Sequence, residues 1–505
     1  MKLNVPLAIL ATASGASAFW RMECRGRAGL LRIDPLVSPG EVGAHAHAVH
    51  GSSGFNEKAT YDDLINGDCT SCAVTQDKSA YWAPGVYFKH SNGSYELVDQ
   101  VGGMLAYYFL NKDASNPGGK ITAFPKDFRM IAGDSLRRNY TIAGQDATQK
   151  DPEKSLWAAL GQTSQVDLSQ RAIGYNCLNY DIAPEPSLYR HYLPEKGYLD
   201  ANCKDGIRIE IMFPSCWNGK DLDSTNHKDH VAYPDLVQDG GCPQGFDVKL
   251  PGLFYETIWA TNNYQGVDGE FVIANGDVQG FGYHADFIMG WDDEAFLQSA
   301  VNTCTNLSGE IQDCPLFNIQ SEEEQRSCKI SVPSALSQEK VVGLVGDSLP
   351  GNVAIQYGPG PATAKNPGPQ TATVAVPTVS YSQGVTSSGY PGLVFKETTT
   401  PSPIPASTPS SASSPEATDF AAAAAAPATT PAPTAPTDDG KYEVIRTEYV
   451  TSGNVVNEII VKEAVEYVTV TTTTVTVSVP AKRAARREAA HAHRHLARGH
   501  GRPRV

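Results

Sequence analysis

The 505-residue sequence lacks several features that would assign it directly to a class of protein. It has no run of about eighteen or more apolar residues, so no segment is predicted to span a membrane. It contains neither a G-x-S-x-G nor an H-E-x-x-H motif, so neither an α/β-hydrolase serine site nor a zincin site is supported. A formal net charge of -15 argues against nucleic acid as a partner.

Cysteine is absent from the last third of the chain. All ten cysteines lie between Cys24 and Cys328, and an even number in a secreted chain implies disulfides. Cys69-Thr70-Ser71-Cys72 resembles half of a zinc site or a redox pair, but no second CxxC accompanies it. We therefore expect these cysteines to form structural bridges.

The N-terminus predicts export from the cell. Residues 1–18 read as a signal peptide, with Lys2, an apolar run over residues 5–13 and a cleavage site at Ala16-Ser17-Ala18. Three N-glycosylation sequons, at Asn92, Asn139 and Asn306, are typical of the same route. The expected product is a secreted glycoprotein, extracellular or associated with a cell wall.

Residues 19–335 are predicted to form one globular domain. Short aromatic-rich runs alternate there with Gly, Pro, Asn and Asp clusters about every ten residues, which is typical of an all-β fold. Residues 207–213 alternate most clearly, Asn92-Gly93 predicts a hairpin turn, and residues 292–301 are the best helix candidate. We expect an all-β, disulfide-stapled domain of the sandwich or jelly-roll type.

The composition changes after this domain. Residues 336–440 are dominated by Pro, Ser, Thr, Ala and Gly, which predicts a disordered linker or stalk. Residues 441–480 are Val/Thr-rich, indicating either a small β-hairpin or a glycosylated tail. Residues 481–505 carry eight basic residues against one glutamate, so this tail can bind polyanions, be clipped after Lys482-Arg483, or simply be a solvated end.

Three clusters of histidine and acidic residues are the candidates for chemistry. If residues 44–49 are extended, His45 and His47 share one face of a strand. His284 and Asp286 share a face in the same way. His227 and His230 lie in a polar loop, where the alternative is that one bonds the loop backbone and the other is exposed.

Together these clusters predict a site. Three histidines and a carboxylate can bind a metal, and without metal an aspartate that orients a histidine makes a general base. The structural alternative is a buried His–Asp hydrogen bond that only orders the domain. No cofactor is required by the sequence, and a divalent metal is compatible with His45, His47 and His284. The predicted catalytic set is His45, His47, His230, His284 and Asp286.

Aromatic residues are a second indication of function, because exposed rings can stack on sugars. Buried rings, in contrast, only pack a core. The predicted substrate contacts are Trp82, Trp217, Tyr233 and Asp277. Glu210, Asp277 and Asp286 are acidic candidates for glycoside hydrolysis, but no spacing singles out a pair.

The motifs in combination resemble a known family, DUF1996, a fungal secreted domain without an assigned function. The resemblance covers roughly residues 19–304, extending towards Cys328. It is carried by Ser38-Pro39-Gly40 before His45-x-His47, by the Phe-Pro-Ser-Cys-Trp loop from Phe213 with its His-x-x-His, and by Asn275-Gly276-Asp277 before His284-x-Asp286. It implies a fungal source and secretion or wall association, and it does not imply a reaction.

The sequence therefore supports three hypotheses. The first is a carbohydrate-active enzyme, a hydrolase or lyase, that modifies wall polysaccharide in a His/Asp-lined cleft. The second is a non-catalytic polysaccharide-binding protein, and the third is a metal-binding surface protein.

Overall fold

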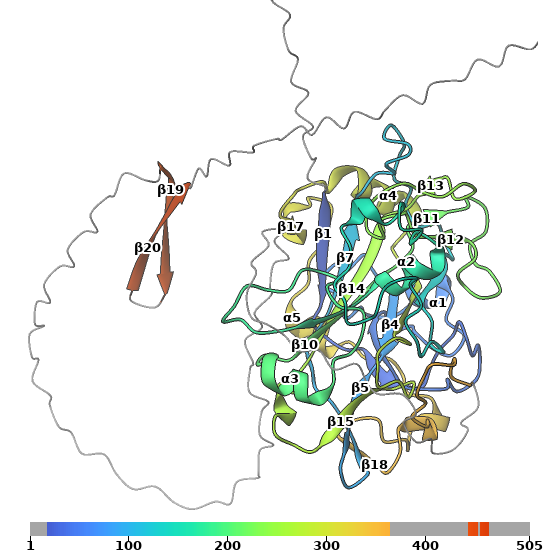
Figure 1. Ribbon diagram of the computed structural model, residues 1–505. Coiled ribbons are helices and arrows are strands. Elements are labelled where there is room, and N and C mark those ends of the chain that lie inside the picture. Colours follow the sequence, from blue (N-terminus) through green and yellow to red (C-terminus); the bar gives the residue numbers. More distant parts are fainter. Residues whose placement is uncertain (1–17, 364–442, 453–454, 464–505) are drawn as a thin grey trace, which may run out of the picture. The chain divides into compact units, whose positions relative to one another are not determined.

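The computed structural model describes residues 18–363, 443–452 and 455–463 (Figure 1). The predicted signal peptide, the Pro-rich part of the linker and the basic tail lie outside the described residues. The chain divides into two units, Met1–Pro403 and Ile404–Val505. In the second unit, β19 (Glu443–Ser452) and β20 (Val455–Glu463) pair as an antiparallel hairpin, one of the two structures expected for the Val/Thr-rich segment.

The first unit is β-rich, as expected, and its strands form four sheets. In spatial order, the six-stranded sheet consists of β17 (Gly309–Glu310), β1 (Phe19–Cys24), β7 (Gln100–Phe109), β14 (Gly252–Trp259), β10 (Ile207–Met212) and β9 (Ile173–Cys177). The five-stranded sheet consists of β2 (Gly29–Leu31), β3 (His47–Gly51), β4 (Ala80–Pro84), β16 (His284–Ile288) and β8 (Arg129–Gly133). The smaller sheets are β15 (Gly269–Ile273), β5 (Val86–His90), β6 (Tyr95–Leu97) and β18 (Leu344–Gly346), and β12 (Val231–Ala232), β11 (Cys216–Trp217) and β13 (Val248–Lys249).

The two largest sheets face each other across the main core. Alternate residues of each strand enter this core, because successive side chains in a strand point to opposite faces. Tyr81 of β4 meets Tyr108 of β7 through a 2.8 Å hydroxyl contact, and its ring lies 5.6 Å from that of Tyr255 in β14. Both faces of the five-stranded sheet are covered, so every residue of β4 and of β16 is buried.

The outer face of the five-stranded sheet is also covered. Its residues form a second apolar cluster with Leu31, Leu36 and Phe55, whose ring lies 5.0 Å from that of Trp82. The outer face of the six-stranded sheet packs against Leu168 of α2 (Gln165–Arg171) in a third cluster. On this outer face the polar residues His47, His284 and Asp286 lie towards one end of the sheet, and Arg129 of β8 lies at the other.

Short helices connect the sheets: α1 (Tyr61–Ile65), α3 (Lys196–Asn202), α4 (Glu294–Thr303) and α5 (Glu322–Ser327). Helix α4 confirms the predicted helix and starts two residues later, because Asp293 caps it by accepting from the Phe296 amide. The strand at residues 207–213 and the Asn92-Gly93 hairpin are likewise confirmed by β10 and by the β5–β6 pair. Among the described helices, none is long and apolar enough to cross a bilayer.

All ten cysteines are paired. The disulfides are Cys24–Cys72, Cys69–Cys328, Cys177–Cys203, Cys216–Cys242 and Cys304–Cys314. The two cysteines of the CxxC motif bond to different distant partners, so they are structural bridges, as expected. The Cys69–Cys328 bond joins a residue shortly after α1 to the residue directly after α5, 259 positions further along the chain.

The first unit continues beyond residue 335, where the sequence predicted that the globular domain ends. Strand β18 pairs with β6, and Glu339 accepts two hydrogen bonds from Arg32, at 2.8 and 3.0 Å. The Gln356 carbonyl accepts from Arg138 at 2.9 Å. Residues 336–363 therefore pack on the domain, and the described part of the expected linker starts with ordered structure.

Candidate functional site

The candidate site lies at the polar end of the outer face of the five-stranded sheet. His47 of β3 pairs with Pro84 of β4, and His284 of β16 pairs with Gly133 of β8. Because Asp286 pairs with Trp82, continuing that register places His284 level with Pro84. His47 and His284 therefore stand on the same row, on either side of a proline, and Asp286 stands one row further along the same face.

His45 precedes β3 and completes a cluster of three imidazoles. Its Nε2 lies 3.0 Å from Nε2 of His284, and its ring centroid lies 4.3 Å from that of His47. One ring nitrogen from each of the three lies within 4.8 Å of the others. Two nitrogens that share one tetrahedral ion at about 2.0–2.1 Å would be roughly 3.3 Å apart, so the spacing is close to that of a metal site. We call His45, His47 and His284 the histidine triad.

Burial keeps the triad neutral. The three side chains are between 0% and 8% exposed. Burial lowers the pKa of His47 and of His284 to about 3 and lowers the pKa of His45 well below its usual value, with His47 and His284 adding to the effect on His45. A neutral imidazole carries a lone pair on one ring nitrogen, which is the form that binds metals.

Hydrogen bonds decide which nitrogen faces the cluster. The Gly282 carbonyl lies 3.0 Å from Nδ1 of His284 and accepts a hydrogen bond from Nδ1–H. The lone pair of His284 is then on Nε2, which is directed at His45. His47 is fully buried, and its ring nitrogens make no hydrogen bond of good geometry, although a backbone group of Ile33 lies near enough to raise its pKa. A buried polar group without a well-formed hydrogen bond costs about 1–3 kcal/mol, so a ligand at the His47 ring would remove this cost.

Asp286 is the carboxylate of the site. It is fully buried, and neither of its oxygens has a hydrogen-bond partner. Burial raises its pKa well above the usual value, the nearby Asp34 adds to this, and Lys228 opposes it. Asp286 does not bond to His284, so the simple His–Asp pair that would only order the sheet is not what these residues form.

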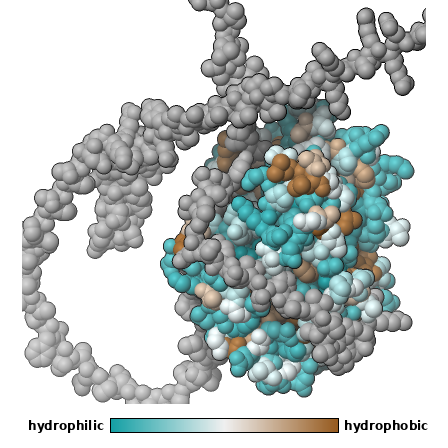
Figure 2. All heavy atoms as spheres, in the orientation of Figure 1, coloured by the Kyte–Doolittle hydropathy of each residue, from teal (hydrophilic) through white to brown (hydrophobic). Residues whose placement is uncertain are grey.

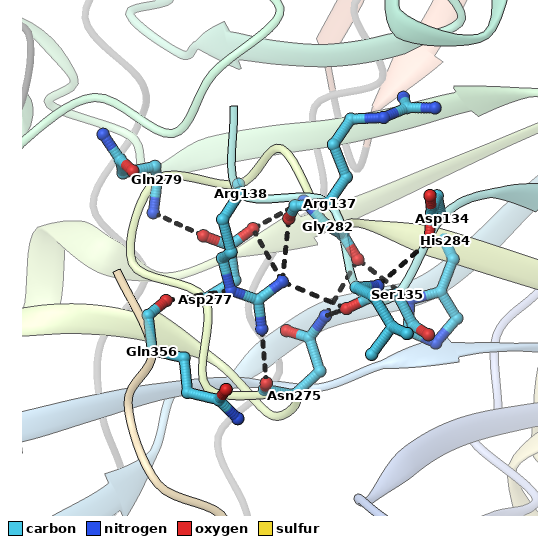
Figure 3. Close-up of polar contacts among 12 residues, drawn as sticks. Asp134, Ser135, Arg137, Arg138, Asn275, Asp277, Gln279, Gly282, His284 and Gln356 are labelled. Carbon is cyan, nitrogen blue, oxygen red and sulfur yellow. Dashed lines mark hydrogen bonds and ion pairs between the residues drawn. The ribbon is translucent and has the colours of Figure 1, made fainter. Parts of the chain in front are cut away.

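The turn before β16 holds His284 in position (Figure 3). Asp277 accepts from the amides of Gln279 and Gly282, at 2.8 and 2.5 Å. Arg138 lies beside it, 3.9 Å away, and donates to four backbone carbonyls, including those of Asn275 and Gln356. This network fixes the Gly282 carbonyl that orients the His284 ring.

A cavity of about 640 Å³ opens over the site. It is lined by His45, His284 and Asp286, by Asp34 and Arg32 from the segment after β2, and by Lys228 from the loop before β12. Residues 351–363 contribute a further wall. Volumes of roughly 300–1,000 Å³ are typical of small-molecule sites, so the cavity is large enough for a ligand.

His230, expected with the triad, is placed elsewhere. Its Nε2 lies 2.9 Å from the Arg129 carbonyl, its Nδ1 lies 3.0 Å from the Ser224 hydroxyl, and its ring packs on Phe128. It lines no part of the cavity. Its loop neighbour His227 does line the cavity, with φ of 58° and Nδ1 2.7 Å from Asp223.

None of the four expected substrate contacts lines the cavity. Trp82 lies in the second apolar cluster, and Tyr233 donates its hydroxyl to the Met212 carbonyl at 2.9 Å. Asp277 is fully buried and holds the turn, whereas Trp217 is half-buried with Nε1 donating to the Asp221 carbonyl. Burial of apolar rings, the ordinary role of aromatics in a β domain, accounts for the first two.

Sequence reasoning missed several cavity residues. Asp34, Lys228, Arg138 and Asn275 line the cavity and were not predicted as site residues, although Asn275 belongs to the Asn275-Gly276-Asp277 turn of the family resemblance. Lys228 lies between His227 and His230 in the polar loop. Its place next to two candidate histidines was the one feature of the sequence that could have identified it as a site residue. Asp34 stands before a proline in a loop, and nothing in its surroundings distinguishes it from a turn residue.

These features define a β-rich, disulfide-linked domain with a buried histidine triad on the floor of a cavity. The family of domains of unknown function DUF1996 matches residues 34–291, just over half of the chain, and the chain belongs to this family. No curated protein and no solved structure matches the chain. The matched range contains the whole triad, Asp286 and Asp34, and it ends before the wall formed by residues 351–363.

Proposed function

We propose that the histidine triad binds one divalent transition-metal ion on the floor of the cavity, and that this centre acts on an extracellular polymer. The observation that carries the proposal is the close approach of three buried, neutral imidazoles, each with a ring nitrogen within 4.8 Å of the others. Imidazole ligands suit zinc, copper, iron and nickel.

The position of the triad favours a catalytic centre over a structural one. Structural zinc sites are closed by four protein ligands, whereas catalytic sites use three and leave a position open. Here three histidines converge, and two of them line the cavity. A divalent ion at such a position can activate water or polarise a ligand oxygen. The proposed activity is accordingly metal-assisted hydrolysis or elimination on a wall polysaccharide.

Several features support an extracellular setting. Five disulfides fit an oxidising compartment, and the sequon asparagines Asn92, Asn139 and Asn306 are all exposed. Strand β1 begins at Phe19, the first residue after the expected cleavage site. Secretion, wall association and a polysaccharide partner are parts of this proposal.

Metal content tests the centre directly. The full chain would be produced through a secretory host, dialysed against zinc, copper or manganese, and assayed by elemental analysis. We expect about one equivalent of one metal in the wild type and loss of it in His47→Ala. His230→Ala is the matched control, since His230 lies in the same domain but bonds only to Ser224 and Arg129.

Circular dichroism would establish that the variants fold, and His284→Gln would replace His47→Ala if the latter does not. A wild type without stoichiometric metal, or a His47→Ala variant that keeps it, would refute the metal centre. If metal is bound but oligosaccharides of the wall are bound without turnover, the centre is a binding site and the catalytic part of the proposal fails.

A further inference from the structure

One cation on the cavity wall is almost unused by the protein itself. Lys228, in the loop before β12, lines the cavity and donates to the Gly133 carbonyl at 2.6 Å. This contact takes one of its three N–H groups. Among the described residues, no carboxylate forms an ion pair with its ammonium group. Lys228 therefore offers the cavity a positive charge and two free donors.

The surroundings of Lys228 compensate its charge only in part. The side chain is half-buried, and burial lowers the pKa of Lys228, whereas the carboxylates of Asp134 and Asp286, beyond ion-pair distance, oppose this shift. Arg137 adds to the lowering. Withdrawing a charge from water without a partner costs free energy, which an anion bound at the ammonium group would offset. This position therefore suits a negatively charged ligand.

The two arginines that line the cavity also keep unused donors. Arg32 bonds to Glu339 through Nε and to the Gly43 carbonyl through Nη1, which leaves its Nη2 without a partner among the described residues. Arg138 donates to four backbone carbonyls, which leaves one of its five N–H groups. Both guanidinium groups can therefore add a hydrogen bond to a ligand that Lys228 binds.

The charges that line the cavity favour an anion even when both aspartates are ionised. The charged residues of the lining are three cations and two carboxylates: Lys228, Arg32, Arg138, Asp34 and Asp286. The acidic partners of the two arginines, Glu339 and Asp277, do not line it. The divalent ion proposed for the histidine triad adds two further positive charges on the floor. A negatively charged group therefore enters a cavity whose lining is positive overall.

The rest of the lining suits the hydroxyl groups of a sugar. The Asn275 side-chain oxygen has no hydrogen-bond partner. One oxygen of Asp34 accepts from the amides of Leu36 and Val37, at 3.2 and 3.1 Å, which leaves the other oxygen available. None of the described residues that line the cavity is Phe, Tyr or Trp, so ring stacking does not contribute. A sugar in this cavity is held by hydrogen bonds and charge.

We propose that Lys228 anchors the carboxylate of an acidic sugar, a uronate residue of a polysaccharide, in the cavity over the histidine triad. A carboxylate brings one negative charge and two acceptor oxygens, which match the charge and the two free donors of Lys228. Charge-assisted hydrogen bonds of this kind are roughly twice as strong as neutral ones. The sugar hydroxyls match the free acceptors of Asn275 and Asp34. The inference rests on the proposed function for the neighbouring metal and names its substrate class.

Binding calorimetry on the full chain, as purified and after loading with metal, tests the anchor. The probes are pentamers of galacturonate, glucuronate and mannuronate, each compared with its methyl ester, which keeps the sugar chain but removes the charge. We expect at least one acid to bind about tenfold or more tightly than its ester. A wild type that binds no acid more tightly than its ester would overturn the inference.

Substitution of Lys228 assigns this preference to its charge. Lys228→Gln loses the charge but can still donate to the Gly133 carbonyl, so it should bind the acid and the ester equally. Lys228→Arg keeps the charge and should keep the preference. The matched control is Lys220→Gln, because Lys220 lies in the same loop, pairs with Asp221 at 3.6 Å and lines no part of the cavity. This control should behave like the wild type.

Circular dichroism and metal content would show that the variants are intact, and Lys228→Met would replace Lys228→Gln if the latter does not fold. A preference that survives in Lys228→Gln, or that Lys220→Gln also loses, contradicts the assignment to Lys228. The two proposals fail separately. Metal without any preference for the acid leaves the metal centre standing and removes this inference, whereas a Lys228-dependent preference without metal does the reverse.

Discussion

Buried histidines dominate the chemistry of this domain at the scale of single residues. His45, His47, His50 and His284 are all at most 8% exposed, and burial lowers the pKa of each. A histidine that stays neutral inside the fold but gains a proton when unfolded makes stability depend on pH. His50 is the best place to measure this effect, because it lies outside the triad.

Replacing His50 by Gln should flatten the acid side of the stability profile. The pKa of His50 is about 3 in the folded protein, against about 6.5 when unfolded. Between these values the unfolded state binds one more proton, so the free energy of unfolding falls by about 1.4 kcal/mol for each pH unit of acidification. Above pH 6.5 this contribution is constant. His50→Gln should lack this slope while still accepting from Gln100, the wild-type contact at 3.3 Å.

Urea unfolding of both proteins at pH 7, 5.5 and 4.5 measures the difference. The pH 7 values serve as the internal reference for any packing loss that Gln introduces. Parallel profiles for the two proteins would show that His50 is protonated in the folded state.

The sequence predicted only some of the residues that form the candidate site. The alternation of His45-x-His47 and His284-x-Asp286 predicted that each pair shares a face, and the structure brings the three histidines together. His230 was predicted from a different pattern, its three-residue spacing to His227 in a loop, and its ring nitrogens face a loop hydroxyl and a backbone carbonyl. Sequence spacing gives the face of a strand, whereas the partner of a loop side chain depends on tertiary contacts.

At the scale of elements, the pairing of β8 with β16 fixes the position of His284 in the triad. Gly133 pairs with His284 at φ of 78°, a conformation that favours glycine. A Cβ at this position would lie 2.3 Å from the Tyr283 carbonyl oxygen. The backbones of β8 and β16 can approach this closely because Gly133 has no side chain.

Gly133→Ala should therefore destabilise the domain and disturb the triad. We expect a loss of roughly 2–3 kcal/mol in the free energy of unfolding, from left-handed strain plus the clash with β16. Metal occupancy should fall with it, because His284 moves with its strand. Gly144→Ala is the control: its φ is also positive, at 72°, but nothing lies within 4 Å of the new Cβ.

The control should lose only about 1 kcal/mol and keep its metal. Denaturant unfolding and elemental analysis of both variants provide the two measurements. Equal losses in the two glycine variants would mean that the β8–β16 contact does not constrain the site.

Individual elements were easier to predict than their order. The alternation of β10 and the Asn92-Gly93 turn come from local patterns, and both appear as expected. The order β2-β3-β4-β16-β8 joins strands some two hundred residues apart, which no local pattern encodes. The β-rich class was therefore accessible, whereas the sandwich or jelly-roll topology stays a prediction that strand periodicity alone cannot establish.

At the scale of the whole molecule, the first unit extends beyond the range that the family match covers. Residues 336–363 pair with β6, bond to Arg32 and Arg138, and line the cavity. Their Pro/Gly-rich composition resembles the linker that follows. Composition predicts where a chain cannot form its own core, but it does not show where such a segment packs on a neighbouring surface. The face visible in Figure 2 is mainly hydrophilic with scattered hydrophobic patches.

Truncated chains distinguish the two candidate ends of the first unit's folded part, residue 335 and residue 363. A chain that ends after Thr363 should keep the melting temperature and metal content of the full protein. A chain that ends after Ala335 should melt several degrees lower, since Arg32 and Arg138 lose their Glu339 and Gln356 acceptors while remaining mostly buried. Differential scanning calorimetry of the three forms is the measurement. Identical melting of both truncated forms would place the boundary at residue 335.

The Cys69–Cys328 bond has a consequence for what proteolysis does to the protein. One end lies near the start of the chain's folded part and the other beyond α5, so a single peptide-bond cut anywhere between them leaves both fragments covalently joined. A protease that cuts one exposed loop between these cysteines therefore produces a two-chain molecule instead of two separate pieces. The β-strands that carry His47 and His284 fall on opposite sides of many such cuts, and the bond keeps them in one particle.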